Sequence, residues 1–263
     1  MNIIVMIKQV PDTNDVKLDP KTGNLIREGI ESIINPDDLH ALEAAVTLKE
    51  RFGGKVTAIS MGPPQAIDAL SEAMGMGVDE CILLSDSAFA GADTWSTSFT
   101  LGKAVEKIGE YDLILCGRQA IDGDTAQIGP QVAEYLGISQ ASYVYDIEQI
   151  EESNIVVKRR LDDGFERLQC RLPALLTVLG EMNEPRHPVI KDLLTACEEK
   201  ARITIWNAAD IGVKTGSVGL EGSLTNVIKT FAPKTKREGE MLEGGPAEAV
   251  EDLVGKLREK KLI

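Results

Sequence analysis

The sequence predicts an α/β fold: a doubly wound, mostly parallel sheet with an antiparallel β addition and a C-terminal arm. Three observations lead to this prediction. Short apolar runs alternate with helix-length segments up to residue 136. Residues 154–171 read instead as a hairpin, and the residues after 205 lose any steady hydrophobic period. Alternating strands and helices are typical of parallel βαβ units.

The first elements show the pattern clearly. Residues 3–10 form a continuous apolar run that ends at Pro11-Asp12, which predicts a central strand buried on both faces. A helix follows, with Asn35 as its N-cap and Pro36 at its first position, and Gly53-Gly54 ends it. Residues 17–27 between these two elements read as a polar surface hairpin.

The alternation continues along the chain. We predict strands at residues 55–61, 80–84 and 112–116, and a helix at 94–108. Further helices follow Pro64 and begin at Gly129-Pro130. This order predicts a Rossmann-like sheet of the kind that binds adenine nucleotides at the carboxyl ends of its strands.

The second half changes character. Residues 154–161 and 165–171 predict an antiparallel pair around an Asp-Asp-Gly turn, and residues 174–179 a further strand. Residues 208–243 are irregular, and an amphipathic helix is predicted at 246–260. An irregular segment of this length is uncommon inside a compact domain and often wraps around a partner protein. We therefore divide the chain into an α/β domain, residues 1–205, and an arm with a helix, residues 206–263.

Composition narrows the possible functions. Acidic residues outnumber basic ones 42 to 28, which argues against nucleic acid or an anionic membrane as a partner. The four cysteines lie far apart, as expected for reduced thiols rather than disulfides or metal ligands. The apolar start lacks a signal peptide and no segment is long enough to span a membrane, so we expect a cytoplasmic protein. Only His40 and His187 are available to a hydrolase, and neither lies in a nucleophile motif.

The longest loop after a predicted strand is the candidate site. Residues 117–130 are rich in Gly and small side chains, carry Arg118 and lead into a helix. Backbone N–H groups of such a loop, together with an arginine, suit a pyrophosphate. The alternative is an ordinary polar loop in which Arg118 pairs with Asp122 or Asp124. Asn35-Pro36-Asp37-Asp38 is first a helix cap, and a ligand role for it stays open.

Several strings along the chain together resemble one family. They follow one another in family order over nearly the whole chain, which makes the match specific. The strings are Val5-Met6-Ile7-Lys8-Gln9-Val10-Pro11-Asp12, Asn35-Pro36-Asp37-Asp38, Met61-Gly62-Pro63, Gly117-Arg118-Gln119-Ala120-Ile121-Asp122, residues 157–166, Leu172-Pro173-Ala174 and Asn183-Glu184-Pro185-Arg186. The sequence thereby resembles the beta subunits of electron transfer flavoproteins.

The resemblance implies a cofactor site and two contact regions. A docking loop for a dehydrogenase partner falls on residues 186–195, with Arg186 and the apolar anchor Ile190, and the arm would wrap an alpha subunit. The implied cofactor-binding residues are Met6, Lys8, Asn35, Asp37, Asp38, Met61, Gly62, Gly117, Arg118, Gln119, Ala120, Ile121, Asp122, Gly123, Asp124, Thr125, Ala126, Gln127 and Ile128.

The family divides by what this site holds, structural AMP or the FAD of electron bifurcation. The string from Asp122 to Pro130 is similar to that of the bifurcating group, and small Gly123 and Ala126 leave room for a larger ligand. The resemblance therefore implies that FAD takes a hydride from NADH and divides the electrons between ferredoxin and the FAD of the alpha subunit. Arg118 would support the reduced flavin or the pyrophosphate, and residues 122–127 would cradle the diphosphate and ribitol.

Three functions follow from this reading. The first is the bifurcating subunit, which serves an acyl-CoA or lactate type of dehydrogenase in anaerobic metabolism and is no stand-alone enzyme. The second is a non-bifurcating carrier subunit that holds AMP. The third is a stand-alone regulator that binds an adenine nucleotide. No metal is expected in any of them.

Overall fold

The computed structural model describes residues 1–12, 31–198, 203–228 and 239–263. These residues form two compact units, Met1–Val227 and Ile228–Ile263. The first unit contains a nine-stranded sheet, and the second contains helix α6 (Pro246–Glu259). The predicted hairpin at residues 17–27 lies outside the described part of the chain, and the boundary that we drew at residue 205 remains a prediction.

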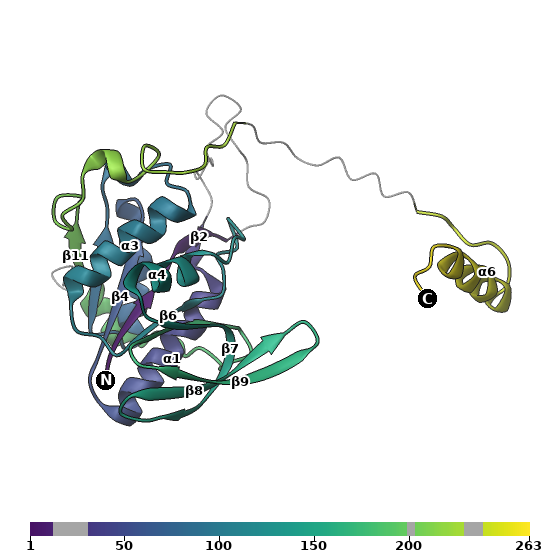
Figure 1. Cartoon of the computed structure of the whole chain (residues 1–263), viewed down its shortest axis with the longest axis horizontal. Helices are drawn as coiled ribbons and strands as arrows, with labels where there is room; N and C mark the ends of the chain where they lie inside the picture. Colours follow the sequence, from purple (N-terminus) through teal and green to yellow (C-terminus); the bar gives the residue numbers. More distant parts are fainter. Residues whose placement is uncertain (13–30, 199–202, 229–238) are drawn as a thin grey trace. The chain divides into compact units, whose positions relative to one another are not determined.

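The sheet confirms the predicted fold class (Figure 1). All neighbours from β11 to β7 are parallel, and β7, β8 and β9 form the antiparallel addition at one edge. The strand order is β11 (Ile203–Trp206), β5 (Glu80–Leu84), β4 (Lys55–Met61), β1 (Asn2–Met6), β6 (Leu113–Gly117), β10 (Ala174–Val178), β7 (Ser139–Ile150), β8 (Asn154–Leu161) and β9 (Gly164–Arg171).

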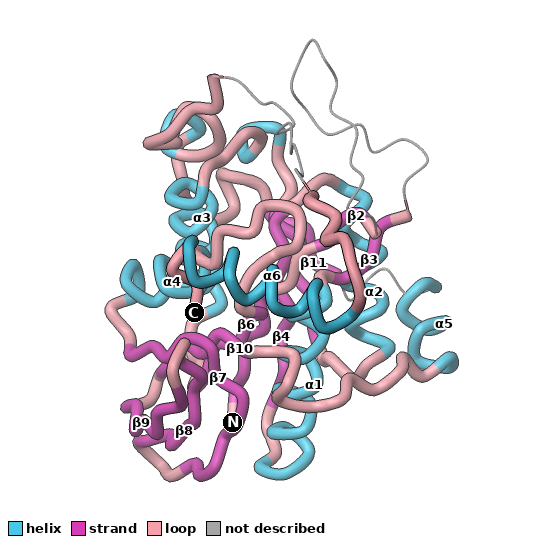
Figure 2. Tube along the Cα trace, turned by 90° about the vertical axis from the view of Figure 1, so that its right-hand side faces the viewer, coloured by secondary structure: helices cyan, strands magenta, loops and turns pink. Residues whose placement is uncertain are grey.

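Helices cover both faces of the parallel strands (Figure 2). Helices α1 (Pro36–Phe52) and α2 (Ile67–Gly75) pack on one face, and α5 (Ile190–Glu198) packs on α2. Helices α3 (Thr94–Ile108) and α4 (Ile128–Leu136) cover the other face. Strand residues alternate between the two cores, so that Ile3 and Val5 face α1 while Ile4 and Met6 face α3 and α4.

The strand order reverses beside β1. The chain runs from β1 through β4 to β5, then returns across the sheet so that β6 pairs with the other side of β1. Ligands of open α/β sheets bind in the crevice that such a reversal leaves at the carboxyl ends of the strands. The crevice lies where Met6 of β1 is level with Cys116 of β6.

Most predicted elements are confirmed, and the differences have physical causes. The predicted strand at residues 3–10 is wrong in extent, because β1 ends at Met6 and Gln9–Pro11 forms a separate strand, β2, antiparallel to β3 (Ser32–Ile34). The backbone of Lys8 leaves the ladder because its N–H donates to the Asp38 carboxylate and its carbonyl accepts from Asn35. Strand β7, which we did not predict, mixes buried and half-exposed residues and is bulged, so its period is irregular.

The residues after β11 belong to the first unit as far as Val227. They are rich in turns, with one short 3₁₀ helix, η4 (Thr215–Ser217), and they return to the loop after β5. The predicted C-terminal helix is confirmed as α6, whose Val250 and Leu253 are exposed. Among the described residues, none of the helices combines the length and apolar character that crossing a membrane requires.

Close packing of α3 on α4 predicts an intolerant glycine. A Cβ added to Gly102 would lie 2.2 Å from Cδ1 of Tyr135, whose ring packs edge-on against Phe99. We expect Gly102→Val to lower the free energy of unfolding by about 2–3 kcal/mol, because the ring cannot move without disturbing Phe99. Gly164→Val is the control, since nothing lies within 4 Å of its added Cβ, and should change stability by less than about 0.5 kcal/mol. Denaturant unfolding measures both, and equal effects would contradict the packing argument.

Candidate functional site

A cavity of about 740 Å³ opens at the strand reversal. Its floor is formed by the ends of three central strands, with Met6 of β1, Met61 of β4 and Cys116 of β6. The loop at residues 117–127 and the first turn of α4 form one side. The volume falls within the range of about 300–1,000 Å³ that is usual for cofactor and small-molecule sites.

Asp38 joins the elements beneath the cavity. Its buried carboxylate accepts the backbone N–H of Lys8 at 2.8 Å and that of Gly117 at 2.9 Å. Burial raises the pKa of Asp38 to about 7, although these two hydrogen bonds lower it. A Cβ at position 117 would lie 2.5 Å from Oδ1 of Asp38, so only glycine allows the loop to approach α1 this closely.

Asn35 occupies the predicted N-cap position of α1, but its side chain does not cap the helix. It is fully buried, its Nδ2 donates to the carbonyl of Gln119 at 2.9 Å, and its Oδ1 accepts the N–H of Ile121 at 3.0 Å. The prediction that the Asn35 side chain caps α1 is therefore wrong. This side chain instead fixes the start of the loop at residues 117–127 through two hydrogen bonds to its backbone.

The far half of the loop has an unusual backbone. Asp124 and Ala126 have φ values of 52° and 54°, in the left-handed region that non-glycine residues rarely adopt. Gln127 precedes α4 without capping it, and its Oε1 accepts from the Thr94 hydroxyl at 2.8 Å. The first turn of α4 lines the cavity without a side-chain cap, and such a helix end favours a negatively charged ligand.

Two ion pairs flank the loop. Lys8 Nζ lies 2.6 Å from both carboxylate oxygens of Asp122, and Arg118 Nε lies 3.5 Å from Asp37 Oδ2. The alternative that Arg118 pairs with Asp122 or Asp124 is therefore wrong. Among the described residues, Arg118 Nε and Asp37 Oδ2 are buried without a hydrogen-bond partner. Burial raises the pKa of Asp37, and the Arg118 charge partly offsets this rise.

The structure gathers most of the predicted site residues around the cavity. Those that line it are Met6, Lys8, Asp38, Met61, Gly117, Arg118, Gln119, Ala120, Gly123, Asp124, Thr125, Ala126, Gln127 and Ile128. Asn35, Asp37, Ile121 and Asp122 lie behind this lining and contact it through the bonds given above. Gly62 is set apart, with its N–H donating to the carbonyl of Leu84 at the end of β5.

Two segments of the lining were not predicted. The loop after β5 and the start of α3 contribute Phe89, Gly91, Ala92, Asp93, Thr94, Thr97 and Leu101. Applying the strand-end rule to β5 would have found this loop. Thr225 and Val227 come from the turn-rich segment after β11, and no local sequence signal indicates their place.

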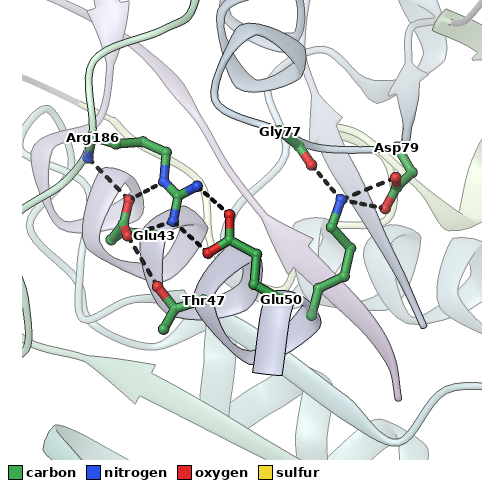
Figure 3. A network of polar contacts seen from close by, with 7 residues as sticks. Glu43, Thr47, Glu50, Gly77, Asp79 and Arg186 are labelled. Atoms are coloured by element: carbon green, nitrogen blue, oxygen red, sulfur yellow. Dashed lines mark hydrogen bonds and ion pairs between the residues drawn. The ribbon is translucent and has the colours of Figure 1, made fainter. Parts of the chain in front are cut away.

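The predicted docking residues are not among those that line the cavity. Arg186 bridges two acidic side chains of α1 (Figure 3), with Nε 2.8 Å from Glu43 and Nη1 2.6 Å from Glu50. The Glu43 carboxylate also accepts the backbone N–H of Arg186 and the Thr47 hydroxyl at 3.0 Å each. Ile190 begins α5 and is 75% exposed. The docking role of both residues stays a prediction.

Comparison with known proteins identifies the family. The family model described as the electron transfer flavoprotein domain matches residues 22–211. A protein of Thermoanaerobacterium thermosaccharolyticum named electron transfer flavoprotein subunit beta is 53% identical, with both chains covered completely. The chain belongs to the electron transfer flavoprotein beta-subunit family.

Two further relatives cover this beta-subunit chain and their own length completely. The caffeyl-CoA reductase-Etf complex subunit CarD of Acetobacterium woodii is 50% identical. An electron transfer flavoprotein subunit beta of Clostridium acetobutylicum is 46% identical. The resemblance noted in the sequence is thus confirmed.

The Arg186 pairs predict a particular acid response. Burial raises the pKa of Glu43, but the hydrogen bonds from Arg186 and the Arg186 charge outweigh this effect, so that the pKa of Glu43 is lowered overall. Hydrogen bonds from Arg186 also lower the pKa of Glu50. A carboxylate with a lowered folded pKa adds stability above its ordinary value, 4.5, and this stability is lost as the pH falls below that value.

Arg186→Met should therefore reduce stability at neutral pH by about 1–2 kcal/mol, a figure that allows for the partial exposure of the pair. The loss of stability below pH 4.5 should become shallower, as urea unfolding at several pH values would show. Arg51→Met removes the same charge from the end of α1, where the arginine packs over Phe52. If both variants had the same pH dependence, the assigned role of Arg186 would be wrong.

Proposed function

We propose that this beta subunit binds FAD in the 740 Å³ cavity and works as half of a heterodimer with an alpha subunit. Bound FAD would accept a hydride from NADH and pass one electron to ferredoxin and one to the FAD of the alpha subunit, which serves a dehydrogenase. The observation that carries the proposal is a cavity lined both by the glycine-rich loop at residues 117–127 and by apolar side chains such as Met61, Phe89 and Leu101.

The loop side of the cavity fits a diphosphate. Arg118 lines this side, and its Nε faces Asp37 at 3.5 Å without a hydrogen bond; the guanidinium suits a phosphate oxygen. The uncapped first turn of α4 lines the same side. The left-handed backbone at Asp124 and Ala126 turns the loop around this point. These groups together would orient and neutralise a pyrophosphate.

The other end of the cavity favours FAD over AMP. Met61, Phe89 and Leu101 give it an apolar lining, and the Thr97 hydroxyl adds a polar group. AMP has neither the second phosphate nor the flavin ring that would fill this end. A planar ring against apolar walls, with few polar contacts, is the usual arrangement in cofactor sites.

The chain's own residues would hold the cofactor and position it. Asn35 and Asp38 fix the loop to the ends of β1 and β6, and the Lys8–Asp122 pair ties the loop to the chain after β1. A loop fixed at three points needs little reorganisation when its ligand binds, so more of the interaction energy is retained as affinity. Gly62 would contribute only by holding β4 to β5.

The partner and location follow from the family. One relative is named as a subunit of a caffeyl-CoA reductase-Etf complex, which supports an acyl-CoA type of dehydrogenase as the partner, with a lactate type as the alternative. In this proposal α5 and Arg186 belong to the docking surface for that partner. We propose a cytoplasmic location as well, which agrees with the use of NADH and ferredoxin in this proposal.

Cofactor content tests the proposal directly. We expect the heterodimer purified with its alpha subunit to release two FAD molecules, and excess NADH to bleach the flavin absorbance in the absence of ferredoxin and the dehydrogenase. Chromatography of the released nucleotides after denaturation gives the stoichiometry. One FAD and one AMP would refute the bifurcating function and leave the AMP-binding carrier. A stable, colourless chain without an alpha subunit would support the regulator instead.

Arg118 provides a second test. Arg118→Ala should weaken FAD binding in this subunit by about 10–100-fold, because a charged hydrogen bond to a phosphate contributes about 1.5–3 kcal/mol. Fluorescence titration of the cofactor-free heterodimer with FAD measures the change. Arg171→Ala, on an exposed residue of β9, is the charge-matched control. Unchanged affinity in the Arg118 variant would remove this residue from the site.

A further inference from the structure

One wall of the cavity comes from the last residues of the first unit. Thr225 and Val227 line it, although they lie far along the sequence from the strand ends that form its floor. We call residues 220–227 the strap. Beyond the strap the chain continues into the separate unit Ile228–Ile263.

One residue, Asp93, holds the strap to the cavity rim through its carboxylate and its backbone. Asp93 Oδ2 accepts both the N–H of Thr225 at 2.8 Å and its hydroxyl at 2.9 Å. The backbone N–H of Asp93 donates to the Ser223 hydroxyl at 2.8 Å. The other oxygen, Oδ1, caps α3 by accepting the N–H of Ser96 at 2.9 Å.

The root of the strap is fixed independently of Asp93. The N–H of Leu220 donates to the Ala90 carbonyl at 2.9 Å, and the residue before it, Gly219, has a φ of 61°. A Cβ on Gly219 would lie 2.0 Å from the Ala88 carbonyl oxygen. The strap therefore has a rigid start, and its far end is attached through Ser223 and Thr225.

The side chains on either side of Thr225 are exposed. Leu224 before it is 75% exposed, and Val227 beyond it is 77% exposed although it borders the cavity. In the described part of the chain, the hydrogen bonds of the strap end at Thr225. Loss of the Asp93 contacts would thus free the wall of the cavity while leaving the root in place.

We propose that the strap retains the bound nucleotide, and that Asp93 is the positioning residue that holds it closed through Thr225. The inference rests on the proposed function for the identity of the nucleotide, an adenine dinucleotide. Asp93 touches the strap with one oxygen and α3 with the other, so a change that breaks only the first contact separates retention from folding. Closure restricts the escape of the ligand and excludes water from its apolar end.

Asp93→Asn makes this separation. Asparagine is as good an N-cap as aspartate, so its oxygen can keep the Ser96 bond, while its amide nitrogen faces the Thr225 N–H and cannot accept from it. Thr225→Val removes only the hydroxyl bond. Thr204→Val, an exposed β11 residue, is the matched control.

The experiment measures how fast the heterodimer releases its bound nucleotide. Each variant is diluted into an excess of a flavin-scavenging apoprotein, and the released compound is identified by chromatography. We expect release about tenfold or more faster in Asp93→Asn, a smaller increase in Thr225→Val, and no change in Thr204→Val. Hydrogen exchange should show lost protection at Thr225 and retained protection at Ser96 in Asp93→Asn.

The outcomes separate the two proposals. If Thr225 loses protection and the release rate does not change, the strap does not retain the ligand and the inference is overturned. Release of AMP instead of FAD refutes the proposed function, while the release rates still decide the role of the strap. If Asp93→Asn does not fold, Thr225→Val decides the question alone, and release at the wild-type rate would overturn the inference.

Discussion

The whole arrangement depends on one buried carboxylate. Asp38 accepts N–H groups from Lys8 and Gly117, which follow or end the two central strands on either side of the reversal. It thereby fixes β1, β6 and the start of α1 at a common point. Such a group is costly to bury unless its oxygens are satisfied, and here backbone donors satisfy both. The absence of a side chain at Gly117 is the complementary requirement, since a Cβ would occupy the space of the carboxylate.

Local pattern was enough to predict the elements whose environment is regular. Strands β4 and β5 have the predicted bounds because their apolar residues face both cores, and helix α3 has them because its apolar residues face one core at a helical period. The errors arise where a distant group decides. The predicted first strand was too long because Asp38 draws the backbone of Lys8 out of the ladder. Asn35 was correctly placed at the helix start, but its partners lie more than eighty residues away.

The lining of the cavity, like the elements of the fold, was predicted only in part. The contiguous loop at residues 117–128 was found, because its glycine-rich composition and its match to a family are both visible in one stretch of sequence. The ion pairs around it were not, since Arg118 meets Asp37 only through the packing of α1 beside β6, and Lys8 meets Asp122 only through the pairing of β1 with β6. The place of Thr225 in the cavity wall could not be predicted from local sequence, because its contact with Asp93 joins residues that are 132 positions apart.

Helix α1 links two regions that the sequence keeps apart. Asp38 in its first turn borders the cavity, and Glu50 near its end holds Arg186 at the root of α5. Glu50 follows Asp38 by twelve positions, which corresponds to about 18 Å along the helix axis. The exposed side of α5 can therefore diverge during evolution without moving the strand ends. If α5 docks a redox partner as we propose, a lineage could acquire a new partner by changing a few surface residues, while the cavity stayed under separate selection.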